Sequence, residues 1–125
     1  MSKYIVMREK SILKEKSFLL GIGVSGICKF LRELKKQGQL YNQFSRAGTA
    51  VGALISEAEF AQSRADFINK LSVALKEANE TNYWLNIMIA GGDLEEDVYK
   101  PLTLLIKEII SILVTSIKTA KKNGM

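Results

Sequence analysis

Apolar residues recur along nearly the whole chain at intervals of three, four and seven, which places them on one face of an α-helix. This pattern predicts four helices, at about residues 11–36, 40–60, 63–90 and 94–122. The apolar stripe of the first helix is Leu13, Leu20, Val24, Ile27, Leu31 and Leu34. Those of the third and fourth run from Phe67 to Ile89 and from Val98 to Ile117. Because short connections make neighbouring helices antiparallel, we expect one all-α domain, residues 1–125, folded as an up-down-up-down antiparallel four-helix bundle.

The expected helix boundaries carry residues that stop or cap helices. Basic residues before a glycine at 35–38, and the pair Gly91–Gly92, are typical helix stops. Ser63 and Asp93, each with an acidic residue three positions later, match the capping box that begins a helix. Pro101 lies inside the fourth helix and predicts a kink there, because proline has no N–H for the preceding turn.

Residues 21–26, GIGVSG, have the G-x-G-x-x-G spacing of a dinucleotide-binding turn. That turn requires a preceding strand, a helix that begins within the motif and an acidic residue about 20 positions later. The preceding residues do not alternate as a strand would, and Glu33 comes too early. We therefore expect no cofactor. Since a glycine costs about 1 kcal/mol in a helix relative to alanine, we interpret these glycines as points of close helix packing.

Two helices have more apolar or small-residue surface than one bundle core requires. The first has a second apolar face, and the second has no charge from Ala47 to Ser56. Because a bundle helix needs one buried stripe, the extra surface predicts a contact between subunits, with a wide core stripe as the alternative. The residues expected in this contact are Ile12, Leu19, Ile22, Gly23, Gly26, Phe30, Gly48 and Gly52.

The composition excludes several kinds of catalytic site. The chain has no histidine and one cysteine, so it lacks histidine-based nucleophile pairs and the usual nitrogen and sulfur metal ligands. Glu57, Glu77 and Glu80 remain as acid–base candidates, but we expect them to pair with Arg64 or Lys76. The sequence thus predicts a protein that is not an enzyme and holds no metal.

Targeting and membrane signals are absent from the sequence. The longest uncharged run, Ser17 to Cys28, is shorter than the roughly 20 residues that span a bilayer. The first residues lack the apolar region of a secretory signal, and a single cysteine forms no internal disulfide. We therefore expect a cytoplasmic protein without a membrane partner.

The net charge of +5 is unevenly distributed. Residues 1–46 carry ten basic and three acidic residues, residues 47–98 three and nine, and residues 99–125 five and one. The expected topology places the start of the first helix beside the end of the fourth. At the other end, the expected topology places four basic residues opposite acidic residues 93–97; they are Lys29, Arg32, Lys35 and Lys36. The basic surface expected at the first end consists of Lys10, Lys14, Lys16, Lys118, Lys121 and Lys122.

Such a basic surface, repeated on each subunit, attracts phosphate backbones and predicts binding of RNA or DNA. Two other interpretations stay open. The lysines can instead complement helix dipoles, leaving a purely structural oligomer or an adaptor for another protein. An enzyme built on Glu57, Glu77 and Glu80 is the third hypothesis, although no nucleophile or ligand set completes its site.

The segment from Ser45 to Gly92 resembles the four-helix-bundle family that is encoded within intervening sequences of 23S ribosomal RNA genes. The matching features are the small-residue run before Ile55-Ser56-Glu57-Ala58, Ser63-Arg64 with Phe67, and Leu75-Lys76-Glu77 with Glu80. The predicted first and fourth helices also match the family in length and pattern, so the resemblance covers nearly the whole chain. Leu54 departs from the pattern, because the family often has asparagine at this position.

The resemblance implies a small bacterial protein that forms a ring-shaped homopentamer and has no assigned activity. It also implies kinship with the accessory variability determinant of diversity-generating retroelements, a similar basic pentamer that works with reverse transcriptase and nucleic acid. The number of subunits comes from this resemblance alone.

Overall fold

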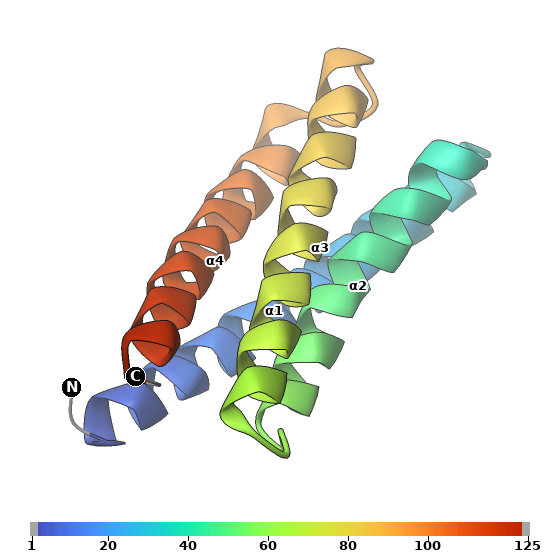
Figure 1. The fold of residues 1–125 in the computed structure, drawn as a ribbon. Coiled ribbons are helices and arrows are strands. Elements are labelled where there is room, and N and C mark those ends of the chain that lie inside the picture. The colour runs from blue at the N-terminus through green and yellow to red at the C-terminus, as the bar shows by residue number, and fades with distance from the viewer. Residues whose placement is uncertain (1–2, 124–125) are drawn as a thin grey trace.

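The computed structural model describes residues 3–123, and side chains from residue 12 to residue 123. These residues form four helices, which confirms the predicted all-α class. They are α1 (Lys3–Glu33), α2 (Gln39–Ala58), α3 (Arg64–Ala90) and α4 (Glu96–Asn123). Each helix packs against its neighbours in the order α1, α2, α3, α4, and α4 closes against α1 (Figure 1). The start of α1, the α2–α3 turn and the end of α4 therefore lie at one end of the bundle.

Helix α1 differs from the expected element at both of its ends. It begins at Lys3, well before residue 11, and ends at Glu33. The chain then turns at Lys35, which has a φ of 60°, while the Lys36 N–H donates to the Leu31 carbonyl at 2.9 Å. This left-handed turn comes before the expected glycine stop. Leu34 consequently falls outside the helix and is 51% exposed, so its predicted place in the core is wrong.

The Ser63 cap predicted at the start of α3 is confirmed, although Asp66 bonds to the residue before Ser63 instead of to Ser63 itself. The Ser63 hydroxyl accepts a hydrogen bond from the Asp66 N–H at 3.0 Å, and the Asp66 carboxylate accepts one from the Gln62 N–H at 3.2 Å. The far end of α3 is also as predicted, because the chain leaves the helix through Gly92 with a φ of 77°. Both ends are thus determined by local residues.

The capping box predicted at the start of α4 is wrong. The helix begins at Glu96, and the Asp93 carboxylate accepts hydrogen bonds from the Lys36 ammonium and the Tyr41 hydroxyl. The Asp93 carboxylate, which could have capped α4, is therefore bonded to residues distant in the sequence. Further along, α4 stays helical on both sides of Pro101.

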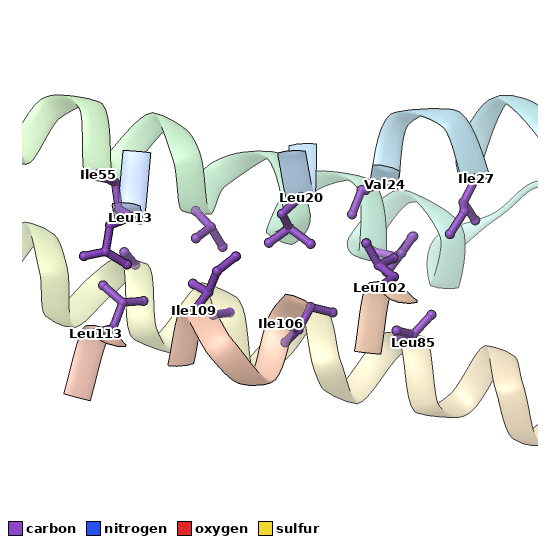
Figure 2. Packing of buried hydrophobic residues seen from close by; sticks show 14 of the residues in the cluster. Leu13, Leu20, Val24, Ile27, Ile55, Leu85, Leu102, Ile106, Ile109 and Leu113 are labelled. Atoms are coloured by element: carbon purple, nitrogen blue, oxygen red, sulfur yellow. The ribbon is translucent and has the colours of Figure 1, made fainter. Parts of the chain in front are cut away.

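The core fills the space between all four helices. Figure 2 shows Leu20 of α1 pointing toward Ile106 and Ile109 of α4, and Val24 of α1 pointing toward Leu102 of α4. The predicted α1 stripe is buried from Leu13 to Leu31, whereas Ile106 and Met88, which are fully buried, were not predicted. Val98 was expected in the core but is 40% exposed, because it lies in the first turn of α4 beside an open groove.

Several glycines allow close approach between helices within the chain. A Cβ atom on Gly48 would lie 2.6 Å from Val24 Cγ2, and one on Gly23 would lie 3.0 Å from Leu102 Cδ1. On Gly52 it would lie 3.2 Å from the Ser17 carbonyl oxygen. Residues 21–26 lie inside α1 and form no strand-to-helix turn. Of the three glycines in this motif, only Gly23 is confirmed as a point of close packing within the chain.

Candidate nucleic-acid and subunit interfaces

Two of the lysines expected at the basic surface form ion pairs with acidic residues of α4 or of the α2–α3 turn. The Lys14 ammonium lies 3.0 Å from the Glu59 carboxylate, and that of Lys16 lies 2.6 Å from Glu108. The side chain of Lys10 lies outside the described residues. These ion pairs make Lys14 and Lys16 links between helices, with less charge left for an external phosphate.

The three lysines near the end of α4 are different. Lys118, Lys121 and Lys122 are exposed, and none pairs with an acidic side chain within residues 12–123. Their spacing of three and four places them on one side of the helix. Their charge is therefore presented to solvent together.

Arg64 lies beside these lysines, a position that the sequence analysis did not predict. Its Nη1 donates to the Ala120 carbonyl oxygen at 3.2 Å, so the first turn of α3 meets the last turns of α4. We call this set the basic cluster. It consists of Arg64, Lys118, Lys121 and Lys122. The signal for Arg64 was its position at the start of α3, which an antiparallel bundle places beside the end of α4.

Three acidic residues close in sequence to the α2–α3 turn already have partners. Glu59 pairs with Lys14, and Glu57 lies 4.0 Å from the Lys70 ammonium. The Asp66 carboxylate accepts the Gln62 N–H at the start of α3. The positive charge of the basic cluster is therefore not cancelled by these residues.

The opposite end of the bundle is partly self-neutralised, as predicted. The Lys36 ammonium lies 2.9 Å from Asp93 Oδ1, and the Tyr41 hydroxyl donates to Asp93 Oδ2 at 3.0 Å. The hydrogen bond with Asp93 raises the pKa of the Lys36 ammonium. This lysine is thus occupied within the protein.

The carboxylates considered for acid–base chemistry bind an arginine that the sequence analysis did not select. Arg46 of α2 donates from Nη1 to Glu77 at 2.7 Å and from Nη2 to Glu80 at 3.0 Å. Its Nε donates to Gln43 Oε1 at 3.1 Å. The predicted partner Arg64 is therefore wrong for this pair of carboxylates, because the rotation of α2 presents Arg46 to α3. Lys76 forms no ion pair with them, and its charge acts on Glu80 only as a weaker attraction.

This cluster has the features of a structural ion pair. The Glu77 side chain is 7% exposed, so an unpaired charge there would be costly. Burial alone would raise the pKa of Glu80, but its hydrogen bonds with Arg46 and Glu77 and the Arg46 charge bring it below the ordinary value. The hydrogen bonds that Arg46 donates to Glu77 and Glu80 raise the pKa of its guanidinium. Both carboxylates are used to join α3 to α2.

Two further findings concern possible chemistry in the described part of the chain. Residues 12–123 contain no group of three histidine, cysteine, aspartate or glutamate side chains arranged to hold a metal ion. Cys28 is partly buried, and this burial raises the pKa of its thiol above the ordinary value.

None of the helices described would be long and apolar enough to cross a bilayer.

The outer side of α1 carries exposed apolar side chains. We call this surface the apolar face and define it by Phe18 (68% exposed), Leu19 (48%), Ile22 (55%) and Phe30 (48%). Sequence analysis had selected the last three, and Phe18 is an addition. A groove beside the apolar face, of about 450 Å³, lies between α1 and α4. It is lined by Gly23, Gly26, Ile27, Phe30, Val98, Pro101, Leu102 and Leu105.

The remaining residues expected at the subunit contact have varied positions. Gly26 is exposed, and a Cβ placed on it would meet open space to a distance of 4 Å, while Ile12 is partly buried. Gly48 is buried against Val24, and Gly23 and Gly52 approach Leu102 and Ser17. The small size of these three glycines is thus accounted for by packing within the chain.

Comparison with known proteins places this fold and sequence in a family. The family model described as 23S rRNA-intervening sequence protein matches residues 9–115. A crystal structure of a protein with unknown function from the S23 ribosomal protein family of Bacteroides thetaiotaomicron superposes with a TM-score of 0.84. It is 42% identical over 88% of this chain and 98% of that one. A comparison with curated proteins found no match. The chain therefore belongs to the 23S rRNA-intervening sequence protein family.

Proposed function

We propose that this protein is a non-catalytic homo-oligomer that binds RNA or DNA through the basic cluster. The observation that carries the proposal is that Arg64, Lys118, Lys121 and Lys122 meet at one end of the bundle while Glu57 and Glu59 are paired with other lysines. Lysine and arginine side chains that neutralise phosphates release counterions, which drives binding without sequence preference. The family description, which refers to 23S ribosomal RNA, supports a nucleic-acid ligand.

Oligomer formation is supported by the apolar face. Phe18, Leu19, Ile22 and Phe30 are exposed on α1, and Phe30 also lines the apolar α1–α4 groove of this small domain. Monomers rarely expose such a surface, and burial contributes about 25 cal/mol per Å² of apolar area. The family resemblance favours a ring of five. A ring would present several copies of the basic cluster to one nucleic acid and raise its apparent affinity.

The absence of catalysis is part of the proposal. The composition offers no histidine and one partly buried thiol. Glu77 and Glu80 are bound to Arg46, so they are poorly placed to exchange protons with a substrate. A cytoplasmic location agrees with a protein of this kind.

A purely structural oligomer or a protein adaptor is the second candidate. The observation that favours it is the apolar face, which requires only a protein surface as its partner. In this case Arg64, Lys121 and Lys122 serve to complement the negative end of the α4 dipole. Nucleic-acid binding separates the two candidates.

The test compares charge removal at the two ends of the bundle. We expect the triple variant K118Q/K121Q/K122Q to bind RNA and duplex DNA more weakly in fluorescence anisotropy. Its plot of log affinity against log salt should be shallower by about 2–3, because each phosphate contact contributes about 0.7–0.9. The matched control K29Q/K35Q/K36Q removes the same charge at the other end and should have a smaller effect.

Three results would contradict the proposal. Absence of binding by the unmodified protein at low salt would refute nucleic-acid binding. Equal losses in both triple variants would show that the basic cluster is not the site. Light scattering that gives a stable 13.9 kDa monomer at micromolar concentration would refute the oligomer.

A further inference from the structure

We propose that the basic cluster recognises single-stranded nucleic acid, and that Phe60 stacks on an unpaired base beside it. This inference rests on the proposed nucleic-acid function and specifies its ligand. The juxtaposition that carries it is an exposed aromatic ring in the same turn region that delivers Arg64 to the end of α4.

Phe60 is exposed yet held by an ordered turn. Its side chain is 81% exposed, the highest value among the large apolar side chains that the structure describes as exposed. The Phe60 N–H donates to the Glu57 carbonyl at 3.0 Å, and the Ala61 N–H donates to the Ala58 carbonyl at 3.2 Å. The backbone is thus fixed, so less conformational freedom is lost when the ring meets a ligand.

The ring and the basic cluster lie at the same end of the bundle. Arg64 comes four positions after Phe60 in the sequence, and a chain of that length spans at most about 14 Å. The Arg64 guanidinium contacts the Ala120 carbonyl at 3.2 Å, beside Lys121 and Lys122. A strand of a few nucleotides can therefore reach the ring and the cationic groups together.

The charges around Phe60 favour an anionic ligand. Glu57 and Glu59 precede it in the sequence, but Lys70 lies 4.0 Å from the first and Lys14 lies 3.0 Å from the second. Unpaired acidic residues would repel a phosphate backbone from the ring. Because these two carboxylates have basic partners, the nearby positive charge of the basic cluster prevails.

An exposed ring beside cationic groups matches a single strand better than a duplex. Bases within a duplex are stacked on each other, whereas a single strand presents base faces that aromatic side chains can stack on. A duplex would contact the same end through its phosphates alone. Every base has such a face, so we expect little sequence preference.

The experiment measures binding of a single-stranded RNA and a blunt duplex of the same length by fluorescence anisotropy. Phe60→Ala should weaken binding of the single strand about five-fold or more, the effect expected for losing one base stack. It should leave duplex binding and the salt dependence unchanged. Phe60→Trp should keep single-strand binding. The control Tyr83→Ala removes an aromatic side chain that is 59% exposed on α3, and should bind as the unmodified protein does.

Several outcomes would overturn the inference. If Phe60→Ala binds the single strand normally, or loses single strand and duplex equally, Phe60 does not stack on a base, although the proposed function stands. If Phe60→Ala changes the mass of the assembly in sedimentation, Phe60 belongs to a subunit contact. If the unmodified protein binds neither nucleic acid at low salt, both proposals fail.

Discussion

Replacing Gly48 with alanine tests whether α1 and α2 depend on close backbone approach. The added Cβ would lie 2.6 Å from Val24 Cγ2 and 2.9 Å from Cγ1, well inside the roughly 3.5–4.0 Å of a favourable carbon contact. Val24 is fully buried and branched at Cβ, so it has little freedom to rotate away. The two helices must move apart to admit the methyl group.

The expected magnitude is the difference between two opposing effects. Overpacking a core costs about 1–3 kcal/mol. Alanine in place of glycine within a helix recovers about 1 kcal/mol of helix propensity. Because the contact at Gly48 is severe, we expect the overpacking cost to dominate. The free energy of unfolding should fall by about 1–2 kcal/mol.

Urea unfolding followed by far-ultraviolet circular dichroism measures this change, and Gly21→Ala is the matched control. Gly21 is also inside a helix, but a Cβ placed there would meet open space to a distance of 4 Å. Gly21→Ala should therefore be neutral or stabilising by up to about 1 kcal/mol. Unfolding should be recorded at several protein concentrations, because subunit association adds to the apparent stability.

Removing the obstructing side chain provides an internal check. In the Gly48→Ala background, Val24→Ala should cost less than it does alone, because the smaller residue relieves the clash. A Gly48→Ala protein that gains as much stability as Gly21→Ala would refute the close packing of α1 on α2. Additive effects of the two substitutions would also count against it.

Two other substitutions test the ion-pair cluster and the apolar face. Arg46→Gln should lower the free energy of unfolding by about 1–3 kcal/mol, because Glu77 stays buried without its partner; urea unfolding that gives no change would contradict this. The lowered pKa of Glu80 contributes stability that is present above the ordinary value of 4.5 and is lost as the pH falls through the lowered value. That acid dependence should be weaker in Arg46→Gln. Gly26→Leu should reduce the sedimenting mass while preserving helicity, since its Cβ would meet nothing within the chain, and exposed Gln37→Leu should leave the mass unchanged.

The sequence by itself determined the helices and most of the core. The repeat from Leu13 to Leu31 is a local property of the chain, because residues three, four and seven apart share a helix face whatever the helix packs against. Capping at Ser63 and the stop at Gly92 depend on neighbouring residues only, and both were predicted. The exposed side chains of Leu19, Ile22 and Phe30 also followed from the excess of apolar positions.

Only the tertiary structure decided which charges and glycines have partners. Arg46 forms ion pairs with Glu77 and Glu80. Asp93 bonds to Lys36 instead of capping α4. The space where a side chain on Gly48 would lie is occupied by Val24. The candidate site differs from the predicted one for the same reason, because Lys14 forms an ion pair with Glu59. Each contact joins residues that are far apart in the sequence and depends on how the helices are rotated and shifted against one another. Periodicity identifies the face of a helix, but the packing of buried side chains sets this rotation and shift.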